Sequence, residues 1–194
     1  MDSRQQLAKR IALCTERDNI KGFVFTGVIG HLKANLGDTA VETILRSAQA
    51  EPSHSAFFSY PLASLLKILQ RALDVPGVDA DAGAFLWAVA GGAVNRSLES
   101  PLGKTMAMLG SSNPHRLLSA SPTAMIAVIS GGERKYEKTG ERSAMMRHRH
   151  ELMGPDYMAG MGERTVLSIA KVKPRIQMHV LDAAAADFDL AYEW

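Results

Sequence analysis

The last third of the chain alternates between two kinds of hydrophobic pattern. Two stretches around a Thr-Gly-Glu turn alternate polar and apolar side chains, which predicts a β-hairpin. A stretch with apolar side chains at helical spacing follows, and then two more alternating stretches. The hairpin strands are residues 134–138 and 142–150, the helix is residues 155–172, and the closing strands are residues 175–181 and 188–194. This order predicts a four-stranded antiparallel ββαββ sheet with one helix crossing it.

The first 130 residues have the spacing of helices, interrupted by Pro and Gly. A β-rich segment at residues 21–25 predicts a brief extended stretch near the start. The expected helices cover residues 5–14, 27–36, 39–49, 61–75, 82–98, 101–109, 114–118 and 123–129. Together the two patterns predict an α+β fold, with N-terminal helices followed by the sheet. We expect a single domain over residues 1–194, mainly helical over 1–130 and sheet-containing over 131–194.

Charge and cysteine content exclude several classes of protein. The net charge is only +2, and the basic side chains of the hairpin interleave with Glu133, Glu137 and Glu141. Cross-strand salt pairs explain that mixture, so we expect no nucleic-acid partner. Cys14 is the only cysteine, which suits a reducing compartment. No apolar stretch reaches the roughly 20 residues that cross a bilayer, and the polar start argues against a secretory signal. We expect a cytoplasmic protein without a membrane span.

The second hairpin strand carries the strongest hint of a metal site. Met146, His148 and His150 alternate to one face, and Arg147 and Arg149 point to the other. Two histidines at this spacing bind a metal ion when a third ligand converges on them. No neighbouring Cys or Asp completes the set, so a partly buried basic strand is the favoured interpretation and we expect no metal. The methionines at positions 145, 146, 153, 158 and 161 indicate core filling between helix and sheet, or an adaptable binding surface.

Cofactor and catalytic motifs are absent from the sequence. His31, which lies in an apolar helical segment, is the least unfavourable haem ligand, but no Cys-x-x-Cys-His attachment motif occurs. The chain also lacks a dinucleotide fingerprint, a complete phosphate-binding loop and a Gly-x-Ser-x-Gly elbow. We therefore expect no cofactor and no catalytic residue, and favour a non-enzymatic protein.

The N-terminal helices carry more apolar side chains than one sheet face can cover. A contiguous apolar surface that remains exposed usually marks an interface, and most closed homo-oligomers are two-fold dimers. We therefore expect a homodimer formed through these helices. The candidate interface residues are Val28, Ile29, Leu32, Leu62, Leu65, Leu66 and Leu69.

Four stretches together resemble a known family over nearly the whole chain. They are Lys21-Gly22-Phe23-Val24-Phe25; Phe57-Phe58-Ser59-Tyr60-Pro61; Ser100-Pro101-Leu102-Gly103 with Asn113-Pro114-His115-Arg116-Leu117-Leu118; and Tyr157-Met158-Ala159-Gly160 through Trp194. The chain is similar to the Myxococcus-type paralogous family of unknown function, which supplies no catalytic residue. The order of elements also resembles the fold of four-vinyl-reductase, haem-NO-binding-like and TRAPP-subunit proteins. That resemblance implies a ligand-sensing or assembly module, often dimeric.

Three functional hypotheses remain open. The leading one is a non-enzymatic, cytoplasmic interaction or sensor module in bacterial signalling or regulation, dimeric and with a protein partner. The alternative is a small-ligand binding protein whose pocket between helices and sheet takes a lipid, an aromatic or a haem-like molecule. An enzyme of unknown class is third. Co-purification of a chromophore or lipid would favour the second hypothesis over the first.

Overall fold

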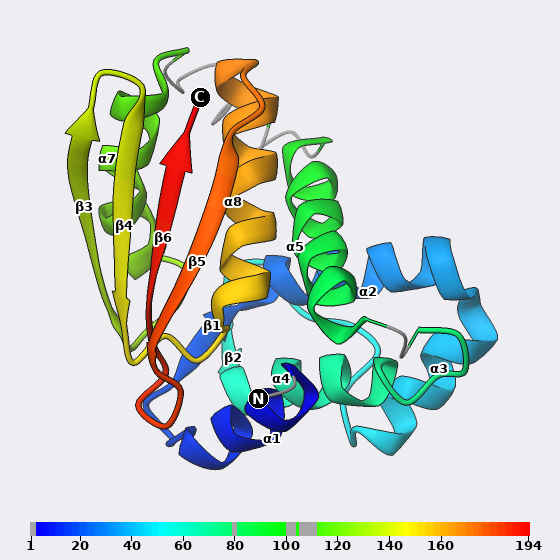
Figure 1. Ribbon diagram of the computed structural model, residues 1–194. Helices are drawn as coiled ribbons and strands as arrows, with labels where there is room; N and C mark the ends of the chain where they lie inside the picture. The colour runs from blue at the N-terminus through cyan, green and yellow to red at the C-terminus, as the bar shows by residue number, and fades with distance from the viewer. Residues whose placement is uncertain (1–2, 79–80, 100–103, 105–111) are drawn as a thin grey trace.

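The computed structural model of the chain describes residues 3–78, 81–99, 104 and 112–194. Its C-terminal part contains a four-stranded antiparallel sheet with the spatial order β3-β4-β6-β5. The strands are β3 (Glu133–Gly140), β4 (Ser143–Arg149), β5 (Arg175–Asp182) and β6 (Asp187–Glu193). Helix α8 (Pro155–Ala170) connects the two strand pairs. The predicted α+β class and ββαββ order are therefore confirmed (Figure 1).

In the part of the chain that the structure describes, helices cover one face of this sheet. Helices α7 (Pro114–Ile126) and α8 lie against it (Figure 1). Alternate residues of β4 are buried, and His148 is among them at 2% exposure. On the other face, Arg147 binds Glu137 of β3 and Asp189 of β6 at 2.6 and 3.2 Å. The predicted alternation and the cross-strand salt pairs are both present.

Five helices of the described chain form the N-terminal part. They are α1 (Ser3–Leu13), α2 (Gly22–Leu36), α3 (Asp38–Ser47), α4 (Leu62–Ala72) and α5 (Ala82–Glu99). Helix α5 packs against both α8 and α2, so it joins the helical part to the sheet part. Asp81 caps α5, because its Oδ1 accepts a hydrogen bond from the N–H of Ala84 at 2.9 Å. One continuous cluster of buried apolar side chains extends through both parts.

Helix α8 is the element that positions the candidate site. Pro155 occupies its first turn, where a missing N–H costs nothing. Its close approach to α5 depends on Gly160, because a Cβ at this position would overlap the backbone carbonyl of Trp87. The indole Nε1 of Trp87 also donates a hydrogen bond to Glu163 of α8 at 2.7 Å. The pairing of α5 and α8 is thus fixed by both backbone contact and a side-chain hydrogen bond.

The structure corrects the sequence-based expectations at two places near α2 and α7. The extended segment is β1 (Asn19–Lys21), which pairs with β2 (Ser59–Pro61) in a small sheet that was not predicted. Three-residue strands are too short to produce an alternating pattern, and α2 already begins at Gly22. Helix α7 runs on through Pro122, where a break was predicted. The expected helix at residues 101–109 lies outside the described residues.

Packing explains why α7 continues past its proline. Pro122 removes one backbone hydrogen bond from the helix interior. Leu118 and Met125, one on each side of it, are both buried in the common core. Their shared burial holds the two halves in one helix.

Within the described chain, no helix combines the length and the apolar character that a bilayer crossing requires.

Candidate functional site

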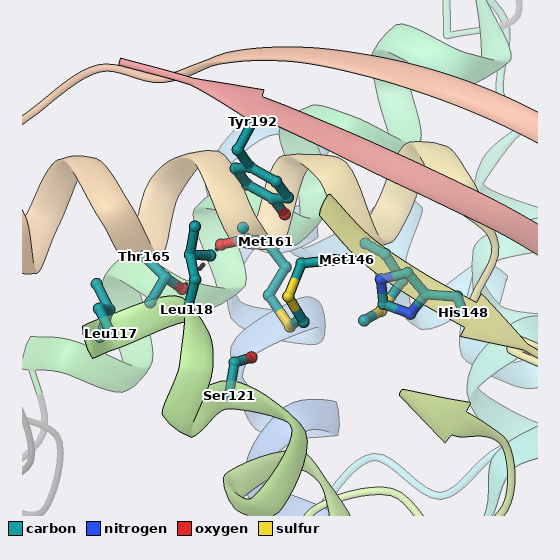
Figure 2. Close-up of a pocket in the computed structure, with 10 residues that line it drawn as sticks. Leu117, Leu118, Ser121, Met146, His148, Met161, Thr165 and Tyr192 are labelled. Carbon is teal, nitrogen blue, oxygen red and sulfur yellow. Dashed lines mark hydrogen bonds between the residues drawn. The ribbon is translucent and has the colours of Figure 1, made fainter. Parts of the chain in front are cut away.

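A small cavity lies between α7, α8 and the covered face of the sheet. Its volume is about 40 Å³, which is room for about three water molecules. Figure 2 shows the side chains that surround it. They come from α7, β4, α8 and β6 and are Leu117, Leu118, Ser121, Met146, His148, Met158, Met161, Gly162, Thr165 and Tyr192.

The regular spacing of two elements brings sulfur and nitrogen atoms to this cavity. Met146 and His148 are two residues apart on β4, so both point inward. Met158 and Met161 are three residues apart on α8, so they share one helix face. Tyr192 enters from β6, and Gly162 leaves room for its hydroxyl, with which any Cβ would collide. Burial raises the pKa of Tyr192 well above its usual range, so the phenol stays protonated.

His148 is held in a fixed orientation by its neighbours. Its ring stacks on Phe188 with centroids 4.7 Å apart and an interplanar angle of 17°. Its Nδ1 is buried without a hydrogen-bond partner and lies 3.9 Å from Oε2 of Glu151. That distance is beyond a hydrogen bond, so the attraction between the two groups is electrostatic.

Behind His148 lies a buried ion pair. Arg134 contacts Oε2 of Glu151 through Nη2 at 2.5 Å and through Nε at 2.6 Å. Burial opposes ionisation of Glu151, but the neighbouring His148 and Arg134 outweigh it and hold the pKa of this carboxyl below its usual range. Glu151 is therefore an anion that Arg134 already neutralises.

A second hollow is an open groove beside the edge strand β5. Its volume is about 510 Å³. Met178 of β5 lines one side, and Trp87 and two alanines of α5 line the other. Asp81 and Asp156 also line the groove and make it acidic. The groove thus combines apolar side chains with carboxylates.

The structure places the seven predicted interface residues in the core. Val28, Ile29, Leu32, Leu62, Leu65, Leu66 and Leu69 are all between 0 and 6% exposed. The helices pack on one another and on α5 as well as beside the sheet, so they cover these side chains within one chain. In this arrangement they offer no surface to a second copy, and a homodimer stays a prediction that needs another face.

The other singled-out residues are distributed over the molecule. Of the three residues grouped on the hairpin strand, Met146 and His148 line the cavity, whereas His150 is exposed after the strand ends. His31 packs against Gly92 of α5, and burial together with Arg96 lowers its pKa. Among the described residues, no three His, Cys, Asp or Glu side chains gather as a metal site would require.

Sequence reasoning grouped the methionines of α8 with those of the hairpin strand as core filling or a binding surface, but it did not bring His148 together with them. The signal was present as Met146-x-His148 on a strand and Met158-x-x-Met161 on the following helix. Each pattern puts two side chains on one face, but only the packing of α8 on the sheet shows that the two faces meet.

Comparison with protein-family models assigns this chain to a family. A family model described as "Protein of unknown function (DUF2378)" matches residues 13–194. The chain belongs to this family. No curated protein sequence matches it.

Solved structures of H-NOX proteins share the fold. The Fe(II) unliganded H-NOX protein from K. algicida has a TM-score of 0.71 at 14% identity, over 90% of this chain and 96% of that one. An oxygen-binding H-NOX domain related to soluble guanylate cyclases has a TM-score of 0.67 at 12% identity, over 90% of this chain and 94% of its own. A third structure, entitled "Modulating Heme Redox Potential Through Protein-Induced Porphyrin Distortion", has a TM-score of 0.70 at 11% identity, over 90% and 100%. The DUF2378 chain therefore has an H-NOX-like fold.

The residues of this chain do not fit a haem. Haem iron requires an axial ligand such as His, Cys, Tyr or Met beside a cavity for the macrocycle. His148 and the three methionines face only about 40 Å³, whereas pockets for organic ligands measure about 300–1,000 Å³. The larger groove presents Asp81 and Asp156, whose charges repel haem propionates. Both hollows therefore argue against a bound haem.

Proposed function

We propose that this chain is a non-enzymatic sensor or interaction module that uses the H-NOX-like fold without haem, in the cytoplasm and as a homodimer. One observation carries the proposal: the chain's own side chains fill the space between α7, α8 and the sheet down to about 40 Å³. A module that folds without haem must bind something else in order to act as a sensor or an interaction module. The two candidates are a much smaller ligand and a partner protein. The DUF2378 match supports this separation from the H-NOX proteins but supplies no role.

The surface that we propose for self-association is the edge strand β5. Met178, Val180 and Leu181 are 41, 48 and 57% exposed, and the free side of an edge strand is a template for another strand. An antiparallel pairing of two β5 strands about a two-fold axis at Met178 would set Ile176 opposite Val180 of the second copy. These side chains lie on the covered face of the sheet, so the pairing would extend that apolar face.

The open groove supports this choice of surface. It lies between Met178 and α5, and the residues of α5 that line it include Gly83, Ala84 and Ala88. Small side chains leave room for those of a second β5 strand. The partner of β5 is thus proposed to be a second copy of this chain.

Haem independence is tested by titrating the purified protein with haemin. We expect no stoichiometric Soret band, and protein isolated from cells supplied with a haem precursor should be colourless. A one-to-one Soret complex that is lost in His148→Ala would overturn the haem-free proposal, because it would show that the cavity opens to admit the macrocycle.

Self-association is tested by light scattering across micromolar concentrations. The wild-type chain should approach twice its mass of 21.0 kDa, and Val180→Lys should shift the mass towards the monomer. Ile126→Lys is the matched control, because Ile126 is 73% exposed and belongs to α7. That helix contacts β3, at the opposite edge of the sheet from β5. A wild-type mass that stays at the monomer value would exclude a β5 dimer. An equal loss of dimer in Val180→Lys and Ile126→Lys would also exclude it.

A further inference from the structure

We propose that the cavity between β4 and α8 is a site for a single Cu(I) ion. Its ligands are the thioether sulfurs of Met146, Met158 and Met161 together with the imidazole Nε2 of His148. This inference rests on the proposed function and deepens it, since it names the small ligand that a haem-free module of this fold would take.

The four side chains converge from two rigid elements rather than from loops. Met146 and His148 come from β4, which is paired on both sides with β3 and β6. Met158 and Met161 come from α8, which packs on α5 and α7 as well as on the sheet. Figure 2 shows Met146, Met161 and His148 directed towards the same space. Sites on paired strands and packed helices hold their ligand atoms at nearly fixed positions.

The orientation of His148 leaves the correct nitrogen for a metal. A metal-binding histidine usually turns its other ring nitrogen towards a carboxylate, which fixes the ring and raises its basicity. Here Nδ1 faces the carboxylate of Glu151 at 3.9 Å, and the side chain is 3% exposed. Stacking on Phe188 sets the plane of the ring. Nε2 is therefore the nitrogen that remains for a ligand in the cavity.

The buried Nδ1 of His148, which has no hydrogen-bond partner, distinguishes this cluster from ordinary core packing. Methionine commonly fills irregular gaps in cores, and three methionines alone would need no ligand. His148 is different, because Nδ1 has no hydrogen-bond partner and the ring borders a hollow. Buried polar nitrogen is costly unless it finds a partner. An ion bound at Nε2 would polarise the ring and strengthen the attraction of the Nδ1 proton to Glu151.

The type and charge of the ligands select Cu(I). Thioether sulfur is a soft donor, and soft donors select Cu(I) over Mg, Ca or Mn. No carboxylate or thiolate lines the cavity, and Arg134 already neutralises Glu151. A divalent ion would therefore bring two uncompensated charges into the core, whereas Cu(I) brings one. The volume of about 40 Å³ accommodates one bare ion but no organic molecule.

The test is an anaerobic titration with Cu(I) in ascorbate, in competition with a chromophoric Cu(I) chelator such as bicinchoninate. The wild-type chain should take one Cu(I). Met146→Leu, Met158→Leu and Met161→Leu preserve side-chain volume while removing sulfur. Each should lower the affinity at least about tenfold, because losing even a residue that only supports a metal ligand costs about 10–100-fold. Met145→Leu is the matched control, because Met145 immediately precedes Met146 on β4 and points to the other face of the sheet.

A second measurement does not depend on the variants folding well. With methionine methyl groups labelled with ¹³C, Ag(I) serves as a redox-inert probe of the same soft site. Three of the ten methionine methyl signals should shift at one equivalent, and the signal assigned to Met145 should not. Shifts spread over all methionines at one equivalent of Ag(I) would refute the site.

The two proposals fail in distinguishable ways. Absence of Cu(I) binding in a chain that forms no stoichiometric Soret complex with haemin overturns the copper site and leaves the haem-free module standing. A stoichiometric haem complex overturns both.

Discussion

Arg134 of β3 and Glu151, in the loop before α8, form a buried ion pair immediately behind His148. Their side chains are 3% and 1% exposed, and the shortest N–O distance is 2.5 Å. A backbone N–H, that of Met153, also donates to Glu151 at 3.2 Å. The pair ties the outer strand of the sheet to the start of α8, and so fixes how β4 and α8 face each other across the cavity.

Removing one partner of this pair should be strongly destabilising. Arg134→Met leaves the carboxylate of Glu151 buried without its cation, and such a loss costs about 3–5 kcal/mol. The double variant Arg134→Met with Glu151→Gln removes both charges and should recover part of that loss. Urea unfolding followed by circular dichroism measures both free energies. A double variant as unstable as the sum of the single variants would show that the pair is not coupled.

Glu151 should also shape the acid stability of the fold. Its pKa is lowered in the folded protein, so its contribution to stability is complete above the unfolded pKa of about 4.3 and is lost as the pH falls through the folded pKa. Glu151→Gln lowers stability at pH 7, because Arg134 is then unpaired. The difference between wild type and variant should narrow as the pH falls below about 4. A difference that is constant from pH 7 to pH 3 would contradict the lowered pKa.

Cys14 should react slowly with thiol reagents. Burial, aided by the nearby carboxylate of Asp18, raises the pKa of this thiol to about 11. At pH 8 the thiolate fraction is then smaller than that of a free cysteine by roughly a hundredfold, and only the thiolate reacts. Colour development with Ellman's reagent, compared between native and urea-unfolded protein, measures the ratio. Equal rates in the two states would show that Cys14 is not shielded.

Much of the fold could be predicted because the strands of the sheet and the helix that covers it each follow a simple sequence period. The alternation in residues 134–150 marks a sheet with one covered face, and the structure has Met146 and His148 inside with Arg147 outside. The spacing of α8 likewise predicts a helix that packs on that face. These patterns are local, so a single sequence carries them.

The parts that could not be predicted depend on contacts between distant segments. β1 and β2 are three residues each, and only their pairing with one another makes them strands. Val28 and Leu62 were expected at an interface because one sheet face could not cover so many apolar side chains. The helices cover one another instead, and both residues are in the common core. The cavity depends on two short motifs meeting across the packing of α8 on β4, which neither motif encodes alone.

The contact between α5 and α8 should decide whether the helical part and the sheet part unfold together. Gly160→Ala places a Cβ onto backbone atoms of Trp87, which cannot move aside as a flexible side chain can, so overpacking should cost about 1–3 kcal/mol. Gly91→Ala is the matched control on α5. Its Cβ would meet Arg164 and Gly160 no closer than 3.7 Å, and alanine favours the helix by up to about 1 kcal/mol.

Urea unfolding followed by both circular dichroism and tryptophan fluorescence measures these effects. Trp87 lies in this contact and donates to Glu163. In a Trp194→Phe background it is the remaining tryptophan, so fluorescence monitors the junction while circular dichroism monitors the whole chain. If one domain spans residues 1–194, the unfolding midpoints from both signals should fall together in Gly160→Ala. Neither midpoint should fall in Gly91→Ala. Two separate transitions in wild type would divide the chain at α5, and equal destabilisation by the two alanines would show that close backbone approach at Gly160 does not set the packing.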